Sequence, residues 1–438
     1  MDRIALVMHT TSYGAPGFVA ACRRAGAEVV IASDRCHVLD GAWRWPADSL
    51  VIDFADPDGA AETIVEAARQ AGRPLRAVLP VGGEAPARVA ALAARRLGLT
   101  ANPPHAMAAA ANKLQMRTRL KDAGANTSAR PELRQPRFLA VASDADPREI
   151  AERLRAPDGV GFPCVVKPLA LSGSRGVMRA DDPATLAAAL ARLGRLLADP
   201  AVRHVDPAAA DQILVESFVG GPEVAVEGLL TCGALDVLAI FDKPDPLDGP
   251  IFEETIYVTP SRWPAATQAR IARATAAAAA ALGLETGAVH AELRLDDGVP
   301  VVIEVAARPI GGLCARTLRF ADSRTLEDLV VEHALGQSQR ADRDGRPSGV
   351  MMIPIPARGP SVLRRVLGLD AARRIAGVED IVISVRPGET VVPLPEGASY
   401  LGFIFASAES PQAVESGLRA AAAQLTFELA PLVPMLRR

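Results

Sequence analysis

The hydrophobic pattern of the first hundred residues alternates between two periodicities. Short apolar runs at 3–9, 28–32, 50–54 and 77–81 predict strands, and segments at 18–25, 60–71 and 85–97 have the helical apolar period. Strands that alternate with helices favour a parallel, doubly wound α/β sheet. The first turn, HTTSYGAPGF, lacks the G-x-G-x-x-G pattern of dinucleotide-binding folds. We therefore expect the crevice at the strand ends, near 10–17 and 80–84, to hold a substrate.

A second, α+β pattern follows a break at 102–104. A basic helix at 112–123 has charges typical of a solvated face, and strands at 137–141, 164–168 and 212–216 are predicted, with helices at 147–154 and 185–196. Lys167 lies near the end of the strand at 164–168, and a loop of small residues, LSGSRGV at 171–177, follows it. The backbone amides of such a loop can point toward phosphate oxygens, and a lysine adds a point charge. This combination predicts a phosphate site.

Residues 290–312, HAELRLDDGVPVVIEVAARPIGG, have the pattern of a β-hairpin that turns at DDG. Pairing across this turn places Glu304 opposite Glu292, and facing carboxylates repel unless a cation lies between them. Two carboxylates with open positions suit Mg²⁺. Arg308 and a glycine pair follow, which are typical of an anion site. An exposed hairpin with incidental acids is the alternative interpretation.

The segment VESFVGGPE offers groups that suit a nucleoside. The main chain at 216–219 can present a donor and an acceptor to an adenine edge, and the carboxylate of Glu223 can accept hydrogen bonds from ribose hydroxyls. A polar strand end followed by a surface acid has the same pattern, so these residues alone leave both interpretations open.

Composition narrows the class of protein. The chain has 438 residues, 49% of them apolar and 23% charged, which is typical of a globular protein of several domains. A formal net charge of −3 argues against a nucleic-acid or membrane partner. No apolar run approaches the ~20 residues needed to span a bilayer. Five scattered cysteines without metal-ligand spacing indicate reduced thiols and a cytoplasmic location.

In combination these motifs resemble the ATP-grasp superfamily, in which two α+β lobes grip ATP and a substrate carboxylate is phosphorylated to an acyl phosphate. Asn112-Lys113, GFPCVVKP, the Gly/Ser loop, VESFVGGPE and HAELRL…IEVAAR follow one another in that order. The resemblance implies ATP and Mg²⁺ (or Mn²⁺) as cofactors. It also implies ATP contacts from Lys113, Lys167, Ser172, Gly173, Ser174, Gly176, Glu216, Val219 and Glu223, metal ligation by Glu292 and Glu304, and catalytic roles for Arg308, Lys167 and Gly311.

One departure from the superfamily pattern points to a branch. Many ATP-grasp enzymes have E-x-N after the second metal carboxylate, whereas this chain reads Glu304-Val305-Ala306, which puts the second metal in doubt. EVAAR with a glycine pair, FEETIYVTPS and the C-terminal tail resemble the L-amino acid ligase branch. That resemblance implies that Glu254 binds a substrate α-amino group and that Arg308 contacts the substrate. His290 could face the same pocket or serve as a structural histidine.

The resemblance implies a mixed α/β and α+β fold and an ATP-dependent carboxylate–amine ligase that acts as a homodimer on small molecules. The alternatives are a purine-pathway or carboxylating enzyme, and an ATP-binding regulatory protein without catalysis. The expected parts are a pre-ATP-grasp domain (1–103), a basic linking helix (104–135), the small lobe (136–216), the large lobe with the metal site (217–345) and a C-terminal lid element (346–438).

Overall fold

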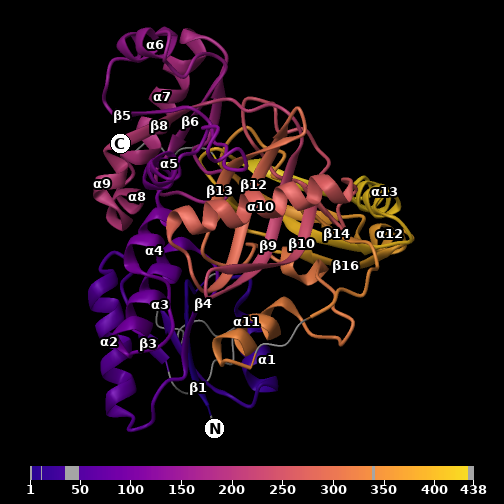
Figure 1. Ribbon diagram of the computed structural model, residues 1–438. Coiled ribbons are helices and arrows are strands. Elements are labelled where there is room, and N and C mark those ends of the chain that lie inside the picture. Colours follow the sequence, from indigo (N-terminus) through magenta and orange to yellow (C-terminus); the bar gives the residue numbers. More distant parts are fainter. Residues whose placement is uncertain (1, 11, 35–48, 338–340, 433–438) are drawn as a thin grey trace, which may run out of the picture.

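The computed structural model describes residues 2–10, 12–34, 49–337 and 341–432. The N-terminal unit and a small lobe lie at opposite ends of the molecule, and a large sheet lies beside both (Figure 1). Within the described residues, no helix has the length and hydropathy required to cross a membrane.

The N-terminal unit is the doubly wound parallel sheet that the sequence predicts. Its strand order is β3-β2-β1-β4, and all its pairings are parallel. Its core side chains are those of the apolar runs, which are buried on both faces of the sheet. The elements are β1 (Arg3–Met8), α1 (Ala15–Arg24), β2 (Glu28–Ser33), β3 (Ser49–Val51), α2 (Pro57–Gln70), β4 (Ala77–Pro80) and α3 (Glu84–Arg96).

Two helices, α4 (Pro104–Ala111) and α5 (Lys113–Asp122), lead to the small lobe. This lobe is an antiparallel sheet of order β5-β8-β6-β7. A capping box at Asp182 and Thr185 fixes the start of its longest helix. The elements are β5 (Phe138–Ala142), α6 (Pro147–Arg155), β6 (Cys164–Pro168), β7 (Met178–Ala180), α7 (Pro183–Leu197), α8 (Pro200–Val205), α9 (Pro207–Ala210) and β8 (Gln212–Ser217).

One sheet of eight strands connects the large lobe to the C-terminal part. Its order is β13-β12-β9-β10-β11-β14-β18-β16, and β11 joins β14 across the limit expected at 345. The boundaries of the five expected parts stay proposals. The large-lobe elements are β9 (Glu223–Thr231), β10 (Ala234–Lys243), β11 (Ile256–Thr259), α10 (Ala265–Leu282), β12 (Gly287–Asp296), β13 (Val299–Ala306), η2 (Cys314–Thr317) and α11 (Leu326–Ala334).

The C-terminal part adds three strands to the large sheet and forms a small antiparallel sheet of order β17-β15-β19. Helices α12 and α13 lie at the end of the large sheet away from β12 and β13 (Figure 1). The elements are β14 (Ser348–Ile353), β15 (Ser361–Leu367), α12 (Leu369–Arg373), β16 (Val378–Ile383), β17 (Thr390–Val391), β18 (Gly402–Ser407), α13 (Pro411–Ala422) and β19 (Thr426–Pro431).

The predicted hairpin is confirmed as β12 and β13. Its turn uses Asp297 and Gly298, both with positive φ (47° and 74°), which is the backbone conformation that favours Asp-Gly in tight hairpins. Glu292 pairs directly with Glu304. Val289 and Leu293 point to the opposite face, where they pack with other apolar side chains against α10.

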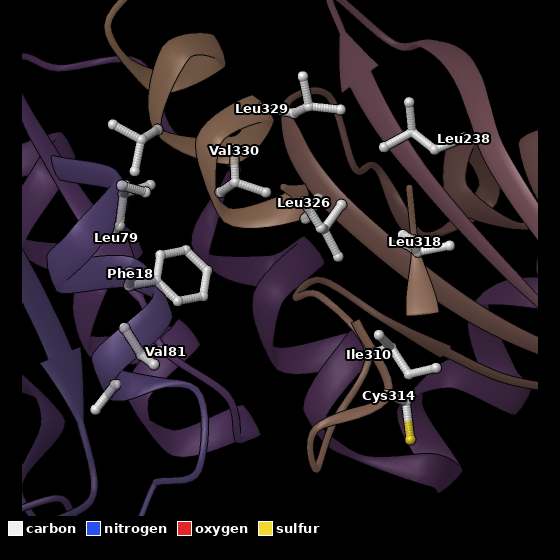
Figure 2. Packing of buried hydrophobic residues seen from close by; sticks show 14 of the residues in the cluster. Phe18, Leu79, Val81, Leu238, Ile310, Cys314, Leu318, Leu326, Leu329 and Val330 are labelled. Carbon is white, nitrogen blue, oxygen red and sulfur yellow. The ribbon is translucent and has the colours of Figure 1, made fainter. Parts of the chain in front are cut away.

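A shared hydrophobic core fixes the N-terminal unit to the large lobe. Figure 2 shows Phe18 and Val81 of the N-terminal unit facing Leu326 and Val330 of α11, with Ile310 beyond them. These side chains are nearly inaccessible to water, so the contact favours a fixed arrangement of the two parts. The loop that begins at residue 308 is thereby held beside the N-terminal unit.

Candidate active site

A cavity of about 620 Å³ lies where the N-terminal unit, the small lobe, the large lobe and the C-terminal part meet. Residues 12–14 and 81–83 of the N-terminal unit line it, so the expected crevice at the strand ends contributes to the cavity; Thr11 lies outside the described residues. The structure brings together fourteen of the side chains and loop residues singled out in the sequence: Lys113, Lys167, Ser172, Gly173, Ser174, Glu216, Val219, Glu223, Glu254, His290, Glu292, Glu304, Arg308 and Gly311.

Gly176 differs from the prediction that it contacts ATP, because it does not line the cavity. Its N–H donates to the carbonyl oxygen of Pro395 at 2.7 Å, so it is not free for a phosphate. A Cβ at this position would lie 2.9 Å from Leu193, and φ is 76°. Glycine is thus required for close packing on α7 and for backbone conformation.

Glu216 is held by two cations. Arg117 donates to its carboxylate at 2.6 and 3.2 Å, and the Lys167 ammonium lies 2.7 Å away. Burial of the Glu216 carboxyl raises its pKa, but the charges of Arg117 and Lys167 outweigh this and lower the pKa to about 2. The side chain of Glu216 therefore fixes Lys167 in place, and only its main chain is left for the expected adenine contact.

Arg117 was missed by the sequence analysis. The basic helix that contains it was expected to be a solvated face, yet the Arg117 side chain is fully buried. It also donates to the carbonyl oxygens of Val302 and Ile303 in β13. No feature of a single basic helix reveals which of its arginines turns inward, because the partner Glu216 lies 99 residues later.

Lys113 connects the glycine-rich loop to the acidic hairpin. Its ammonium donates to the carbonyl oxygen of Leu171 at 2.7 Å and lies 3.6 Å from the carboxylate of Glu304. Its backbone N–H also donates to Leu169 at 2.9 Å. Lys113 and Lys167 thus both lie at the cavity, as a site for phosphates requires.

Three carboxylates share one buried ammonium. Lys243 Nζ donates to Glu223 at 2.6 Å, to Glu292 at 3.0 Å and to Glu254. Burial is the main reason that the pKa of Glu254 rises to about 7; the charges of Glu292 and Glu223 add to it, and Lys243 opposes it. The carboxylate oxygens of the three acids lie within 4.8 Å of one another.

Lys243 was also missed, although the sequence contains a signal for it. The chain has only four lysines, Lys113, Lys121, Lys167 and Lys243, among 48 basic residues. Three of the four lie at the site. Because arginine replaces lysine at most exposed positions without penalty, a lysine in such an arginine-rich chain indicates a position that requires a compact ammonium.

His290 lies between two carboxylates. Its Nδ1 is 3.2 Å from Glu227 and its Nε2 is 3.7 Å from Glu292. Burial lowers the pKa of the imidazole, but the hydrogen bonds and charges of Glu227 and Glu292 raise it to about 9. The ring is charged at neutral pH, and both nitrogens face protein carboxylates. His290 thus contacts Glu292 and also lines the cavity, so its predicted substrate contact stays a proposal beside a structural role.

Arg308 is oriented by the N-terminal unit. Its guanidinium donates to Glu84, the first residue of α3, at 2.7 and 3.0 Å. Behind it, the fully buried carboxylate of Glu227 accepts from the N–H of Ile310 at 3.1 Å. Neither Glu84 nor Glu227 was singled out in the sequence, because each acts through a partner more than 80 residues away. Together they hold the turn at 308–312 open to the cavity.

The donor set fits a hard divalent cation. Glu292 and Glu304 are directly opposed on β12 and β13, and both line the cavity. Burial raises the pKa of Glu292, but the Lys243 charge leads the effects that hold it well below its ordinary value, so this carboxylate is ionised. The ammonium group of Lys243 lies beside Glu292 and that of Lys113 beside Glu304, so positive charge already occupies the place where a metal cation is expected.

Aromatic and apolar side chains line another part of the cavity. All three tyrosines of the chain, Tyr13, Tyr257 and Tyr400, lie there, with Phe403 and Met352. Tyr13 approaches Phe403 edge to face at 5.6 Å between ring centres. Aromatic residues make up only 4% of the chain, and several of these few come together at the cavity from segments far apart in the sequence.

Comparison with known proteins agrees with this geometry. Residues 160–317 match the ATP-grasp domain, and residues 353–430 match the second C-terminal domain of L-amino acid ligases. The chain contains an ATP-grasp domain. The predicted resemblance and the predicted mixed α/β ATP-grasp fold are confirmed.

Individual relatives include ligases. The chain resembles an L-amino acid ligase from Bacillus licheniformis, with 27% identity, a TM-score of 0.79 and 98% of both chains covered. It is 26% identical to dapdiamide A synthase of Enterobacter agglomerans over 53% of this chain and 48% of that protein. It shares only the fold with N5-carboxyaminoimidazole ribonucleotide synthetase from Thermotoga maritima (14% identity, TM-score 0.68, 98% and 99% covered). The chain spans about half the length, or less, of the curated relatives it matches.

Proposed function

We propose that this protein is an ATP-dependent carboxylate–amine ligase that phosphorylates a substrate carboxylate to an acyl phosphate and couples it to the amine of an amino acid, forming an amide or dipeptide with ADP and phosphate. One observation carries the proposal. A single cavity contains two lysines beside a glycine-rich loop, two opposed carboxylates, and an arginine followed by a glycine turn. The similarity to L-amino acid ligases supports it.

The nucleotide has a defined place in this proposal. Lys113, Lys167 and the loop residues Ser172, Gly173 and Ser174 bind its phosphates. The main chain of Glu216 and Val219 contacts adenine. The Glu223 carboxylate accepts hydrogen bonds from the ribose hydroxyls and gives up part of its contact with Lys243. The cavity lining at these positions supports this arrangement.

Glu292 and Glu304 would hold Mg²⁺, with Mn²⁺ as a substitute. When bound, the metal neutralises charge on the ATP phosphates. The residues of this chain then act on the substrate. The substrate carboxylate attacks the γ-phosphorus in line, the bond from this phosphorus to the β–γ bridging oxygen breaks, and ADP leaves, while Lys167 balances the negative charge that develops. A neutral amine next attacks the acyl carbon, and Arg308 and the amide of Gly311 stabilise the tetrahedral oxyanion. The bond from this carbon to the phosphate oxygen then breaks, inorganic phosphate leaves, and the amine nitrogen loses one proton.

The acidic and apolar parts of the cavity support the choice of substrate. Glu254 would bind an α-ammonium group, because an incoming positive charge favours the ionised form of a carboxyl with a raised pKa. The wall of Tyr13, Tyr400 and Phe403 would contact an apolar side chain. Arg308 would contact the substrate carboxylate or acyl phosphate.

The first experiment is phosphate release from ATP and Mg²⁺ against a panel of amino acids, singly and in pairs, with mass spectrometry of the products. Release that requires amino acids, together with a dipeptide mass, supports the proposal. Turnover on bicarbonate or a ribosylamine alone would indicate the carboxylating or purine-pathway alternative. ATP binding without turnover on any substrate would indicate a regulatory protein.

We also propose a cytoplasmic location and a homodimer. Cys22, Cys164, Cys232 and Cys314 are free thiols, and Cys36 lies outside the described residues. Reduced cysteines are typical of the cytoplasm. The dimer is supported by the family resemblance alone, and light scattering of the purified chain tests it.

A further inference from the structure

The glycine-rich loop at 171–177 rests on a distant segment, residues 393–398 of the C-terminal part. The N–H of Gly176 donates to the carbonyl oxygen of Pro395 at 2.7 Å, and Arg175 Nε donates to the carbonyl oxygen of Glu396 at 2.7 Å. A Cβ at Gly173 would lie 3.5 Å from Ala398. One backbone and one side-chain hydrogen bond therefore dock the end of the loop on this segment, and Gly173 lies beside Ala398.

The side chain of Glu396 makes a second connection. Its carboxylate accepts two parallel hydrogen bonds from Arg192 of α7, at 2.5 and 2.8 Å. The hydrogen bond from Arg192 is the main reason that the pKa of Glu396 lies below its ordinary value. Because α7 packs directly beneath Gly176, Glu396 connects both to the loop and to the helix that supports it.

The loop is held at both ends and lies on the cavity. At its start, the carbonyl oxygen of Leu171 accepts from Lys113, and at its end Arg175 and Gly176 contact the C-terminal segment. Leu171 and Ala398 both line the cavity, so the loop and the segment form one continuous wall. Movement of Glu396 away from Arg192 would free the end of the loop that Lys113 does not hold.

We propose that Glu396 is a positioning residue that holds the loop closed and thereby keeps water from the reacting acyl phosphate. This inference rests on the proposed ligase function. If the loop opens, water attacks the acyl carbon in place of the amine and the bond from that carbon to the phosphate oxygen breaks. The products are the free carboxylate, inorganic phosphate and a proton. ATP is then consumed without an amide product.

The expected size of the effect follows from the exposure of the pair. The Arg192 and Glu396 side chains are 39% and 40% exposed, so solvent screens their attraction. Pairs of this kind shift an equilibrium by about two- to fivefold. Glu396→Gln should therefore increase loop opening by about that factor, whereas Glu396→Arg places two positive charges together and should increase it by about tenfold.

The first test measures the loop itself, without reference to activity. Hydrogen exchange of the peptide that covers residues 171–177, in the full chain, should be faster in Glu396→Gln and fastest in Glu396→Arg. The swapped pair Arg192→Glu with Glu396→Arg should return the rate toward wild type. Glu428→Gln is the matched control, because Glu428 on β19 pairs with Arg365 on β15 and, within the described part of the chain, makes no connection to α7 or the loop. Its exchange rate should equal that of wild type.

The second test measures phosphate released per amide bond formed. The ratio should rise in the same order of variants as the exchange rate, and the swapped pair should restore it. Unchanged exchange in Glu396→Arg would overturn the proposal, as would faster exchange with an unchanged ratio. If wild type forms no amide from any substrate, the ligase proposal fails, while the exchange rates still show whether Glu396 holds the loop.

Discussion

Glu216 and Glu254 line the same cavity, with side chains 2% and 18% exposed, yet their pKa values move in opposite directions. Glu216 has two cations to itself, Arg117 and Lys167, and its pKa falls to about 2. Glu254 shares Lys243 with two other carboxylates, and its pKa rises to about 7. Burial raises the pKa of both carboxyls. The number of cations beside each carboxylate therefore decides whether its pKa ends below or above the ordinary value.

The difference assigns distinct tasks to the two glutamates. Glu216 is a fixed charge that positions a lysine, and it has no capacity for a further cation. Glu223 and Glu292 also have Arg294 and His290 nearby, whereas the cation beside Glu254 is the shared Lys243, and an ammonium group on a substrate can add a further positive charge there. This contrast between a satisfied and an unsatisfied carboxylate supports the proposed places of nucleotide and amino acid in the cavity.

The largest expected effect comes from leaving Glu216 with fewer cations, as Glu254 has. Arg117→Met removes one of its two cations and leaves a buried charge only half compensated. We expect the free energy of unfolding to fall by about 3–5 kcal/mol, measured by denaturant unfolding. Arg365→Met, which breaks an exposed pair with Glu428, is the control and should change stability little. Equal effects of the two substitutions would contradict the comparison.

Arg308→Ala tests the substrate part of the cavity separately from the nucleotide part. We expect kcat to fall by about 10²–10³-fold, because an oxyanion donor is lost, while ATP binding measured by calorimetry stays nearly unchanged. Glu84→Gln keeps the size of the partner and should reproduce part of the loss. A large decrease in ATP affinity for Arg308→Ala would place this residue with the nucleotide and refute its assigned role.

The opposite pKa shifts predict opposite dependences of stability on pH. Glu216 stabilises the fold above its ordinary pKa of 4.5, and this contribution is lost as the pH falls toward 2. Glu254 has a raised pKa, so its contribution is present below pH 4.5 and lost as the pH rises toward 7. Each contribution amounts to at most ~3 kcal/mol.

Thermal unfolding of Glu216→Gln and Glu254→Gln from pH 3 to pH 8 measures these contributions. The deficit of Glu216→Gln relative to wild type should grow from pH 3 to 5. The stability of Glu254→Gln relative to wild type should increase from pH 5 to 7. If the stability difference from wild type changed with pH in the same direction for both variants, the opposite pKa shifts of the two carboxyls would be contradicted.

The smallest effect concerns the aromatic wall. Tyr13→Ala removes a ring that packs edge to face on Phe403. Aromatic pairs of this kind contribute about 0.5–1.5 kcal/mol, so kcat/KM for an amino acid with an apolar side chain should fall about two- to tenfold. The KM for ATP should not change, and Tyr13→Phe should retain activity. A change in the KM for ATP alone would indicate that these aromatic side chains contact the nucleotide.

The sequence predicted elements better than their connections. Local periodicity found the strands of the N-terminal sheet and the hairpin register, because both depend on neighbouring residues. The family resemblance implied a phosphate contact for Gly176, whereas its N–H donates to Pro395. Arg117 was assigned to solvent, whereas Glu216 draws it into the core. Each error concerns a partner that lies far away in sequence.

By itself, the sequence determined the order of the motifs, the alternation of strands and helices, and the opposition of Glu292 and Glu304 across a turn, since these follow from spacing and short-range pairing. Only the tertiary structure decided which charges are satisfied. Lys243 among three acids, Arg308 held by Glu84 and the loop held by Glu396 join separate parts of the chain. Charge interactions depend on distance and burial, and both are set when the parts pack together.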